Sequence, residues 1–195
     1  MDELGIVIRS LNPERCEDWL QYFDRIAFQD HEEWAFCYCL EGHLTPKMQE
    51  EWTDAKERRE RAIDLIRSGE MQGYLAYSED TVVGWCNAND RASYRYLTEM
   101  FRSIGYQPEG PTDAKIKAIY CFLVAPEYRG RGVAQRLLDR ACEDAAREGY
   151  FAVEVYPFAD EKFPFQYHGT EQMYKNSGFV EIADLKYVKV MRRNL

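Results

Sequence analysis

The sequence predicts a single mixed α/β domain, residues 1–195, in which a central β-sheet is flanked by helices. Hydrophobic residues make up 46% of the 195 residues, enough to bury a sizeable core. Apolar runs at 116–124 and 150–156 enclose a strongly amphipathic stretch at 133–148. A strand, a helix and a second strand in this order form a right-handed unit with parallel strands by default. We therefore expect part of the sheet to be parallel.

Strands and helices can be assigned along the rest of the chain in order. The β-branched run 5–9 predicts a strand, and a helix over 13–28 follows it, with proline at its first position. A second helix is expected over 46–68, again beginning at a proline. Two strand-like runs joined by Ser78-Glu79-Asp80 predict a hairpin. Further on we expect a helix over 92–104, a short helix before Gly178 and a closing strand over 187–191.

The charge balance favours a cationic partner. With 25 basic and 34 acidic side chains the formal net charge is −9, and ten acids against three bases within residues 1–45 give that segment −7. Binding to a nucleic-acid duplex requires clustered Lys and Arg, so we expect no nucleic-acid partner. A solvated acidic surface that aids solubility is the alternative explanation of the excess.

Neither a membrane span nor a secretion signal is evident. The longest apolar run, 119–125, is far shorter than the roughly 20 residues that a spanning helix needs. The first residues lack a basic segment followed by an apolar one. We expect a cytoplasmic protein without a membrane partner.

The six cysteines are expected to be reduced thiols, because they are scattered in a chain without a secretion signal. One cluster, Cys37 and Cys39 with His31 and His43 nearby, contains the residue types that zinc prefers. Its C-x-C spacing is poor for a structural zinc site, and no second cysteine pair is available. Packing of both thiols on one face of an extended segment is the expectation, and we predict no metal.

The loop between the buried strand 116–124 and the helix 133–148 has the features of a phosphate site. Its sequence is Arg129-Gly130-Arg131-Gly132. Glycines allow backbone N–H groups to approach a ligand, the start of a helix carries partial positive charge, and two arginines add full charges. Three classes of phosphate ligand must be considered. A Walker loop is absent, and the dinucleotide fingerprint G-x-G-x-x-G has Gln135 where its third glycine belongs.

The third class is acetyl-CoA. Residues 129–134, R-G-R-G-V-A, match [QR]-x-x-G-x-[GA], and their setting V-A-P-E-Y-R-G-R-G-V-A-Q-R-L-L resembles the acetyl-CoA motif of the GNAT N-acetyltransferase superfamily. Tyr174 to Phe179 resembles the Y-x-x-x-G-F element of the same family. The order of strands and helices extends the resemblance over nearly the whole chain. It implies a GNAT-like mixed central sheet flanked by helices.

The resemblance also implies where acetyl-CoA binds. Backbone N–H groups of six loop residues would hold the pyrophosphate: Arg129, Gly130, Arg131, Gly132, Val133 and Ala134. Pantetheine would lie along the preceding strand beside Phe122, Leu123 and Val124, and one N–H group there would stabilise the oxyanion. In this interpretation residues 1–115 form the acceptor side and residues 116–195 form the acetyl-CoA side.

The catalytic groups are less completely implied. Tyr174 is the candidate general acid for the leaving CoA thiolate, and its alternative is a packing role. Several family members use a glutamate as general base on the strand before the loop, but Ala118 occupies that position here. Glu154, His168 and Asp90 are possible substitutes. For His168 a structural role is the alternative, and Glu154 could be either buried or cleft-facing.

We therefore expect an N-acetyltransferase that moves an acetyl group from acetyl-CoA directly to a small-molecule or peptide amine, which the charge suggests is cationic. A non-catalytic CoA-binding or regulatory module of the same fold is the alternative. A homodimer is compatible with the sequence. Neither the acceptor nor the general base can be identified from it.

Overall fold

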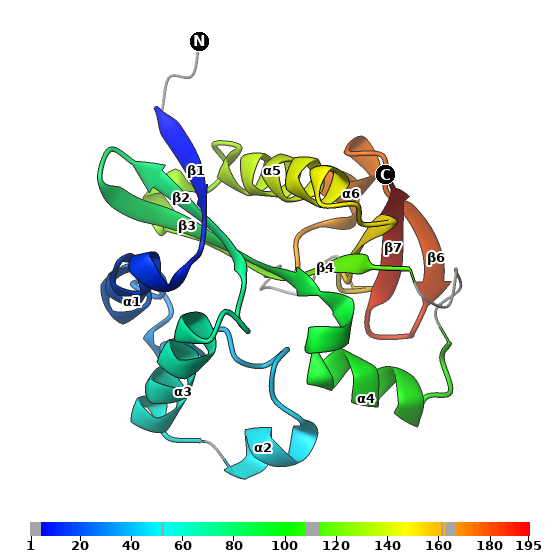
Figure 1. Cartoon of the computed structure of the whole chain (residues 1–195), viewed down its shortest axis with the longest axis horizontal. Helices are drawn as coiled ribbons and strands as arrows, with labels where there is room; N and C mark the ends of the chain where they lie inside the picture. The colour runs from blue at the N-terminus through cyan, green and yellow to red at the C-terminus, as the bar shows by residue number, and fades with distance from the viewer. Residues whose placement is uncertain (1–4, 52, 108–113, 161, 163–166) are drawn as a thin grey trace.

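The computed structural model describes residues 5–51, 53–107, 114–160, 162 and 167–195. Its centre is one seven-stranded sheet in the order β1-β2-β3-β4-β5-β7-β6 (Figure 1). All neighbouring strands are antiparallel except β4 and β5, which are parallel as predicted. The strands are β1 (Ile6–Ser10), β2 (Gly73–Ser78), β3 (Thr81–Asp90), β4 (Ile116–Val124), β5 (Ala152–Val155), β6 (Val180–Asp184) and β7 (Lys189–Asn194).

Helices cover both faces of the sheet. In the view of Figure 1, α5 and α6 lie above it, and α1 to α4 lie below it. The described helices are α1 (Cys16–Arg25), α2 (Pro46–Glu51), α3 (Ala55–Arg67), α4 (Arg95–Ser103), α5 (Val133–Arg147) and α6 (Glu171–Asn176). One continuous core of buried apolar side chains joins the two layers through the sheet. The mixed α/β fold predicted from the sequence is confirmed.

The prediction of one helix over 46–68 is wrong in one respect, because the structure has two helices there, α2 and α3. Asp54 begins α3 by accepting hydrogen bonds from the backbone N–H groups of Lys56 and Glu57, at 2.9 and 3.1 Å. Its own backbone is extended, which ends the preceding helical segment. Trp52, expected on the buried face, lies outside the described residues. The missed signal is an aspartate that satisfies the first N–H groups of a new helix.

The amphipathic helix α5 packs its apolar face on the sheet as predicted. Leu137, Leu138, Ala141 and Ala145 are fully buried there. The helix begins at Gly132 (φ 82°) and is followed by Gly149 (φ 75°), both in the left-handed region that favours glycine. Packing against five strands fixes the position of the loop that precedes α5.

The parallel strands β4 and β5 separate halfway along β4. Residues 116–119 of β4 pair with 152–155 of β5, and β5 then ends, shortly before Pro157. Strand β4 continues to Val124, still paired with β3 on its other side. The second half of β4 therefore has one edge that no strand of the described chain covers.

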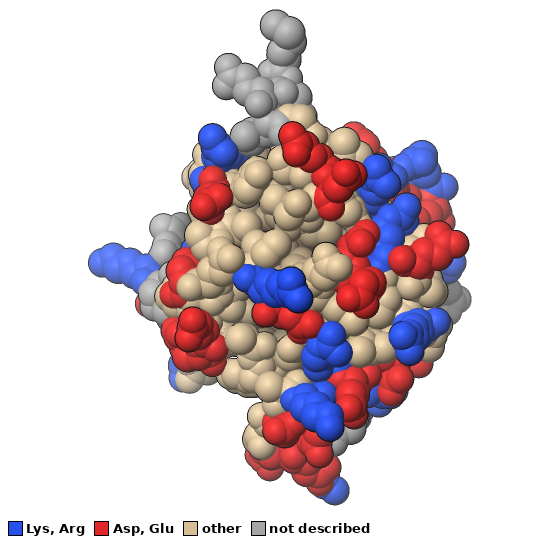
Figure 2. All heavy atoms as spheres, turned by 90° about the vertical axis from the view of Figure 1, so that its left-hand side faces the viewer, with Lys and Arg blue, Asp and Glu red and all other residues tan. Residues whose placement is uncertain are grey.

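Charges of both signs mix on the surface. Figure 2 shows the face at the left of Figure 1, where Asp and Glu side chains are interspersed with Lys and Arg. Within the described residues, no helix is both long and apolar enough to cross a membrane.

Candidate active site

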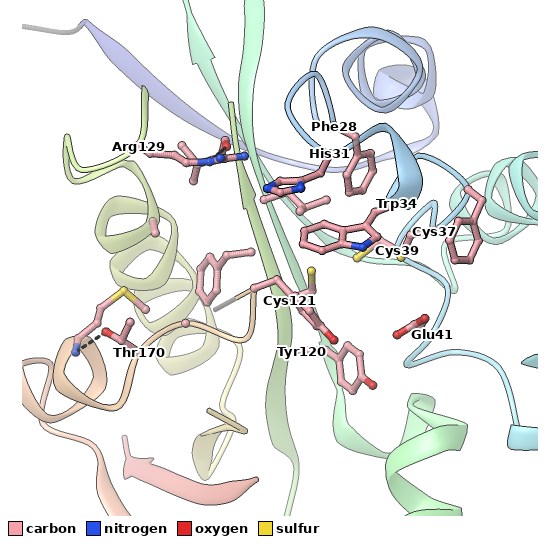
Figure 3. A pocket seen from close by; sticks show the side chains of 18 residues that line it. Phe28, His31, Trp34, Cys37, Cys39, Glu41, Tyr120, Cys121, Arg129 and Thr170 are labelled. Atoms are coloured by element: carbon pink, nitrogen blue, oxygen red, sulfur yellow. Dashed lines mark hydrogen bonds between the residues drawn. The ribbon is translucent and has the colours of Figure 1, made fainter. Parts of the chain in front are cut away.

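A pocket of about 610 Å³ lies beside the uncovered half of β4. Its walls come from the segment between α1 and α2, from β4 and from residues 167–173. Figure 3 shows Arg129 at one end of this pocket, Glu41 and Tyr120 at the other, and Trp34 with three cysteine side chains between them. The described lining residues are Phe28, His31, Trp34, Phe36, Cys37, Cys39, Glu41, Tyr120, Cys121, Phe122, Leu123, Val124, Arg129, Ala134, Tyr167, Gly169, Thr170 and Met173.

A strained turn forms the wall that faces β4. Tyr38 and Cys39 have φ values of 44° and 51°, a left-handed conformation that non-glycine residues rarely adopt. Buried Asn87 on β3 holds this turn by donating from Nδ2 to the Cys39 carbonyl oxygen at 3.1 Å. Consecutive strained residues of this kind cluster at functional sites. Here the turn presents Cys37, Cys39 and Glu41 to the pocket.

Glu41 contributes a carboxylate to a mostly apolar lining. It is half-buried, and within the described chain its carboxylate has neither a salt bridge nor a hydrogen bond. Its backbone oxygen accepts a hydrogen bond from Gln49 Nε2 at 2.9 Å. Burial, followed by the nearby Glu41 charge, raises the pKa of both Tyr120 and Tyr167 above the ordinary value.

Three thiols line the middle of the pocket. Burial raises the pKa of Cys39, but hydrogen bonds from Cys121 and Asn87 outweigh it, so the pKa of this thiol is lowered. The hydrogen bond to Cys39, followed by burial, raises the pKa of Cys121. All six cysteines are free thiols. Among the described residues, no group of three His, Cys, Asp or Glu side chains is arranged to hold a metal ion.

The uncovered edge of β4 offers backbone hydrogen-bonding groups to the pocket. The Phe122 N–H donates to the Tyr167 carbonyl oxygen at 2.6 Å, pointing away from β3. Because successive residues of a strand point in opposite directions, the Val124 N–H points to the same edge as that of Phe122, and Leu123 faces β3. Tyr167 therefore already occupies part of the β4 edge with which an extended ligand could pair.

The loop before α5 meets the pocket at its other end. Gly130 and Gly132 have φ values of 70° and 82°, and a Cβ at either position would meet no atom within 4 Å. No side chain of the described residues caps the N-terminus of α5, so its first N–H groups remain available to an anion. Arg129 Nε donates to the Val124 carbonyl oxygen at 2.9 Å, and the guanidinium also binds the Asp30 carboxylate. The carboxylate of Asp30 therefore balances part of the Arg129 positive charge.

Tyr174 on α6 lies one layer behind the pocket wall. Its side chain is fully buried, and its hydroxyl donates to the His168 carbonyl oxygen at 2.5 Å. Gly169, which lines the pocket, separates this hydroxyl from the pocket space: a Cβ at Gly169 would lie 2.4 Å from Tyr174 Oη. Burial raises the pKa of Tyr174 well above its ordinary value.

The structure places Glu154 in a buried ion-pair cluster. Its fully buried carboxylate accepts from Arg192 Nε and Nη2 at 3.0 and 2.6 Å, from Arg91 Nη1 at 3.0 Å, and from the Tyr156 hydroxyl at 3.1 Å. These donors satisfy both of its oxygens. The arrangement favours a structural role, in which Glu154 ties β5 to β7 and to the turn after β3.

His168 is also buried and held by backbone. Its Nδ1 donates to the Tyr120 carbonyl oxygen at 2.5 Å, and Tyr167 and Gly169 on either side of it line the pocket. Burial lowers the pKa of His168 to about 4. A neutral imidazole with so low a pKa is a poor proton acceptor at neutral pH, which favours a role in holding the residue 167–169 segment against β4.

Most of the residues that line the pocket were not predicted from the sequence as site residues, and Glu41 and Tyr167 are the two that matter most for its chemistry. Glu41 was one of ten acids in residues 1–45, and nothing in its spacing separates it from the others. The strained turn that points it inward depends on Asn87, 48 residues away from Cys39. Tyr167 reaches β4 through its backbone, which carries no sequence signal.

Comparison with known proteins places the chain in a family. The profile of the acetyltransferase (GNAT) family matches residues 9–162, which is most of the chain. The comparison with curated proteins found no match. Among solved structures, the PaiA N-acetyltransferase of Thermoplasma acidophilum is 18% identical with a TM-score of 0.57, covering 97% of this chain and 99% of that one. An acetyltransferase of Thermus thermophilus is 14% identical with a TM-score of 0.55, covering 100% of both chains. The protein therefore belongs to the GNAT family of acetyltransferases.

Proposed function

We propose that the protein transfers the acetyl group of acetyl-CoA directly to an amine, with no covalent enzyme intermediate. The observation that carries this proposal is the continuity of the site. The uncovered edge of β4 runs from the loop before α5 into the pocket, and Glu41 lies at the far end. The Thermoplasma structure is a complex with coenzyme A, which supports the same ligand here.

Residues 116–195 would supply the acetyl-CoA side. The N–H groups of the residue 129–134 loop fit a pyrophosphate because Gly130 and Gly132 leave open space and no described side chain caps the start of α5. Pantetheine would lie along Phe122 to Val124, where the hydrogen bond from Phe122 to Tyr167 must open to free that N–H. Acetyl-CoA supplies the thioester whose carbonyl carbon the amine attacks.

Two groups of the chain would stabilise the developing charges. The Val124 N–H points to the uncovered edge and is our candidate donor to the oxyanion. Tyr174 is our candidate donor to the CoA sulfur; its hydroxyl must leave the His168 carbonyl oxygen, and the segment at Gly169 must move aside, before it can reach the sulfur. Its raised pKa suits hydrogen bonding to the thiolate better than complete proton transfer.

Residues 1–115 would supply the acceptor side. A primary amine has a pKa of about 10.4 and must lose a proton before it attacks. Among the described lining residues, Glu41 has the carboxylate that can take this proton. The burial and hydrogen bonds of Glu154 and His168 favour supporting roles for both.

Release of CoA thiol tests the proposal. Acetyl-CoA is mixed with the protein and, separately, with 2-phenylethylamine, spermidine, lysine or a peptide with a free N-terminus. We expect thiol release above the hydrolysis background with at least one amine, and an acetylated amine by mass spectrometry. Acetyl-CoA binding by calorimetry without thiol release for any amine would instead support a non-catalytic CoA-binding module.

A further inference from the structure

The pocket contains few charged groups, and most of them are neutralised by neighbours. Arg129 binds Asp30, and His31 Nδ1 is 3.1 Å from a Glu33 carboxylate oxygen while its ring stacks on Trp34 at 4.3 Å. Glu41 differs, because its carboxylate lacks an ion pair within the described chain. The lining that the structure describes therefore offers a cation one carboxylate.

Two other carboxylates of residues 1–45, those of Asp18 and Asp24, contact elements elsewhere in the fold. Asp18 accepts from the Tyr77 hydroxyl at 2.6 Å, far along the chain, on β2. Asp24 binds Arg59 of α3 and also accepts from the Tyr38 hydroxyl at 2.9 Å. These carboxylates stabilise contacts between elements. Of the ten acids in residues 1–45, Glu41 alone is among the described residues that line the pocket, so that lining has no broad acidic wall that could hold several ammonium groups.

Aromatic side chains share the pocket with this carboxylate. Tyr120 lies at the same end of the pocket as Glu41 (Figure 3), and Tyr167 also lines the pocket. The Tyr120 ring is held in place by stacking on Tyr94 at 5.4 Å. An ammonium group is stabilised by a carboxylate and also by the faces of aromatic rings. Fixed rings beside one unpaired carboxylate form a site for a single ammonium.

The rest of the acceptor wall is apolar. Phe28, Trp34 and Phe36 come from the same segment as Glu41, and three cysteine side chains also line the pocket. A second ammonium on the acceptor would find no counter-charge among these side chains, and the faces of their rings would offset only part of the cost of removing it from water. An aromatic ring or alkyl chain would instead gain from burial in the same space.

We propose that the acceptor is a monoamine with an aromatic or other apolar body, and that Glu41 binds its ammonium group. This inference rests on the proposed acetyl transfer and specifies its substrate class. It narrows the expectation from charge alone, which any cationic amine would satisfy. The strained turn at Tyr38 and Cys39, held by Asn87, is the device that positions Glu41.

Binding to the CoA-loaded protein tests the role of Glu41 without turnover. Calorimetry compares 2-phenylethylamine with its neutral analogue 2-phenylethanol in the wild type, in Glu41→Gln and in the control Glu32→Gln. Glu32 is exposed on the same segment and lies outside the pocket lining, so its substitution makes the same charge change away from the site. In Glu41→Gln we expect the Kd of the amine to rise about tenfold or more, with the Kd of the alcohol unchanged. Glu32→Gln should change neither Kd.

Turnover tests the substrate class. We expect kcat/KM for 2-phenylethylamine to exceed that for spermidine by at least tenfold in the wild type. Efficient acetylation of spermidine with poor use of 2-phenylethylamine would overturn the substrate class while leaving the proposed function intact. Failure of every amine in the thiol assay would refute the proposed function itself. An equal amine Kd in Glu41→Gln and wild type would overturn the assignment of the ammonium site.

Discussion

Asp30 and Arg129, 99 residues apart in the sequence, form a two-pronged ion pair at the end of the pocket that Arg129 lines. The contact joins the segment after α1 to the loop before α5. Arg129 also donates to the Val124 carbonyl oxygen, so one guanidinium ties both walls to the end of β4. The contact thus links the two walls of the pocket, which we propose to be its acceptor side and its acetyl-CoA side.

Because of this ion pair, we expect the difference in stability between the wild type and Asp30→Asn to depend on pH. Hydrogen bonding to Arg129 lowers the pKa of Asp30, so its contribution is present above the unfolded pKa of about 4 and is lost as the pH falls through the lower folded value. Both side chains are more than a third exposed, so Asp30→Asn should cost less than about 1 kcal/mol at pH 7. Urea unfolding at pH 7 and at pH 2.5 measures this. A difference that persists at pH 2.5 would show that the ion pair is not its source.

The glycines at the two ends of α5 provide a matched test of the acetyl-CoA loop. Gly132→Glu and Gly149→Glu both place a side chain at a positive φ with open space around it. Each should lose roughly 1–2 kcal/mol of stability. Gly132→Glu alone should also lose acetyl-CoA affinity, because its carboxylate lies where phosphate would bind. Calorimetry that gives the two variants equal affinity would refute the phosphate site.

Removing the Tyr174 hydroxyl should slow the reaction. We expect Tyr174→Phe to lower kcat by about 10- to 1000-fold with little change in acetyl-CoA affinity. Tyr77→Phe is the control, because it removes another largely buried tyrosine hydroxyl that bonds to Asp18 outside the pocket. Steady-state kinetics on both variants distinguish a catalytic role of the Tyr174 hydroxyl from a packing role. If both variants keep wild-type turnover, the role of Tyr174 is in packing.

Gly169 keeps the space next to that hydroxyl open. A Cβ at this position, where φ is 74°, would lie 2.4 Å from Tyr174 Oη and 2.8 Å from its Cζ. Gly169→Ala should therefore destabilise the protein by about 1–3 kcal/mol. The double variant Gly169→Ala with Tyr174→Phe removes the closest clash, so the two effects should be less than additive in chemical unfolding. If the two losses of stability simply add, the clash with Tyr174 Oη is not what destabilises Gly169→Ala.

Two buried histidines predict loss of stability below neutral pH. Burial lowers the pKa of His43 and of His168 to about 4, against about 6.5 in the unfolded chain. Between these values the unfolded chain binds more protons, so the free energy of unfolding decreases as the pH falls from 6.5 towards 4. The full effect is about 3 kcal/mol for each histidine. Urea titrations between pH 7.5 and 5 should show this slope in the wild type and a smaller one in His168→Gln. Equal slopes in the two proteins would mean that His168 does not contribute to the pH dependence of the free energy of unfolding.

The sequence predicted the loop before α5 and the helix itself in more detail than the pocket wall formed by the segment between α1 and α2, for a physical reason. Gly132 needs a left-handed backbone and α5 needs a periodic apolar face, and both requirements appear in neighbouring residues. Glu41 and Asp30 owe their positions to contacts with residues far away in the sequence. Asp54 is an intermediate case. A helix-capping residue is a local signal, but the apolar pattern continues on both sides of Asp54 and led to the prediction of one long helix.

The separation of β4 from β5 makes the strand a natural reporter for hydrogen exchange. Residues 117–119 of β4 are paired with β3 on one side and with β5 on the other, so their amides should exchange only when the core opens. The Phe122 amide is protected by one contact with Tyr167, which lies on a loop. A ligand that replaces Tyr167 along β4 would change exchange at Phe122 and Val124 and leave exchange at residues 117–119 unchanged. Exchange along this one strand can thus distinguish occupancy of the pocket from a change in global stability.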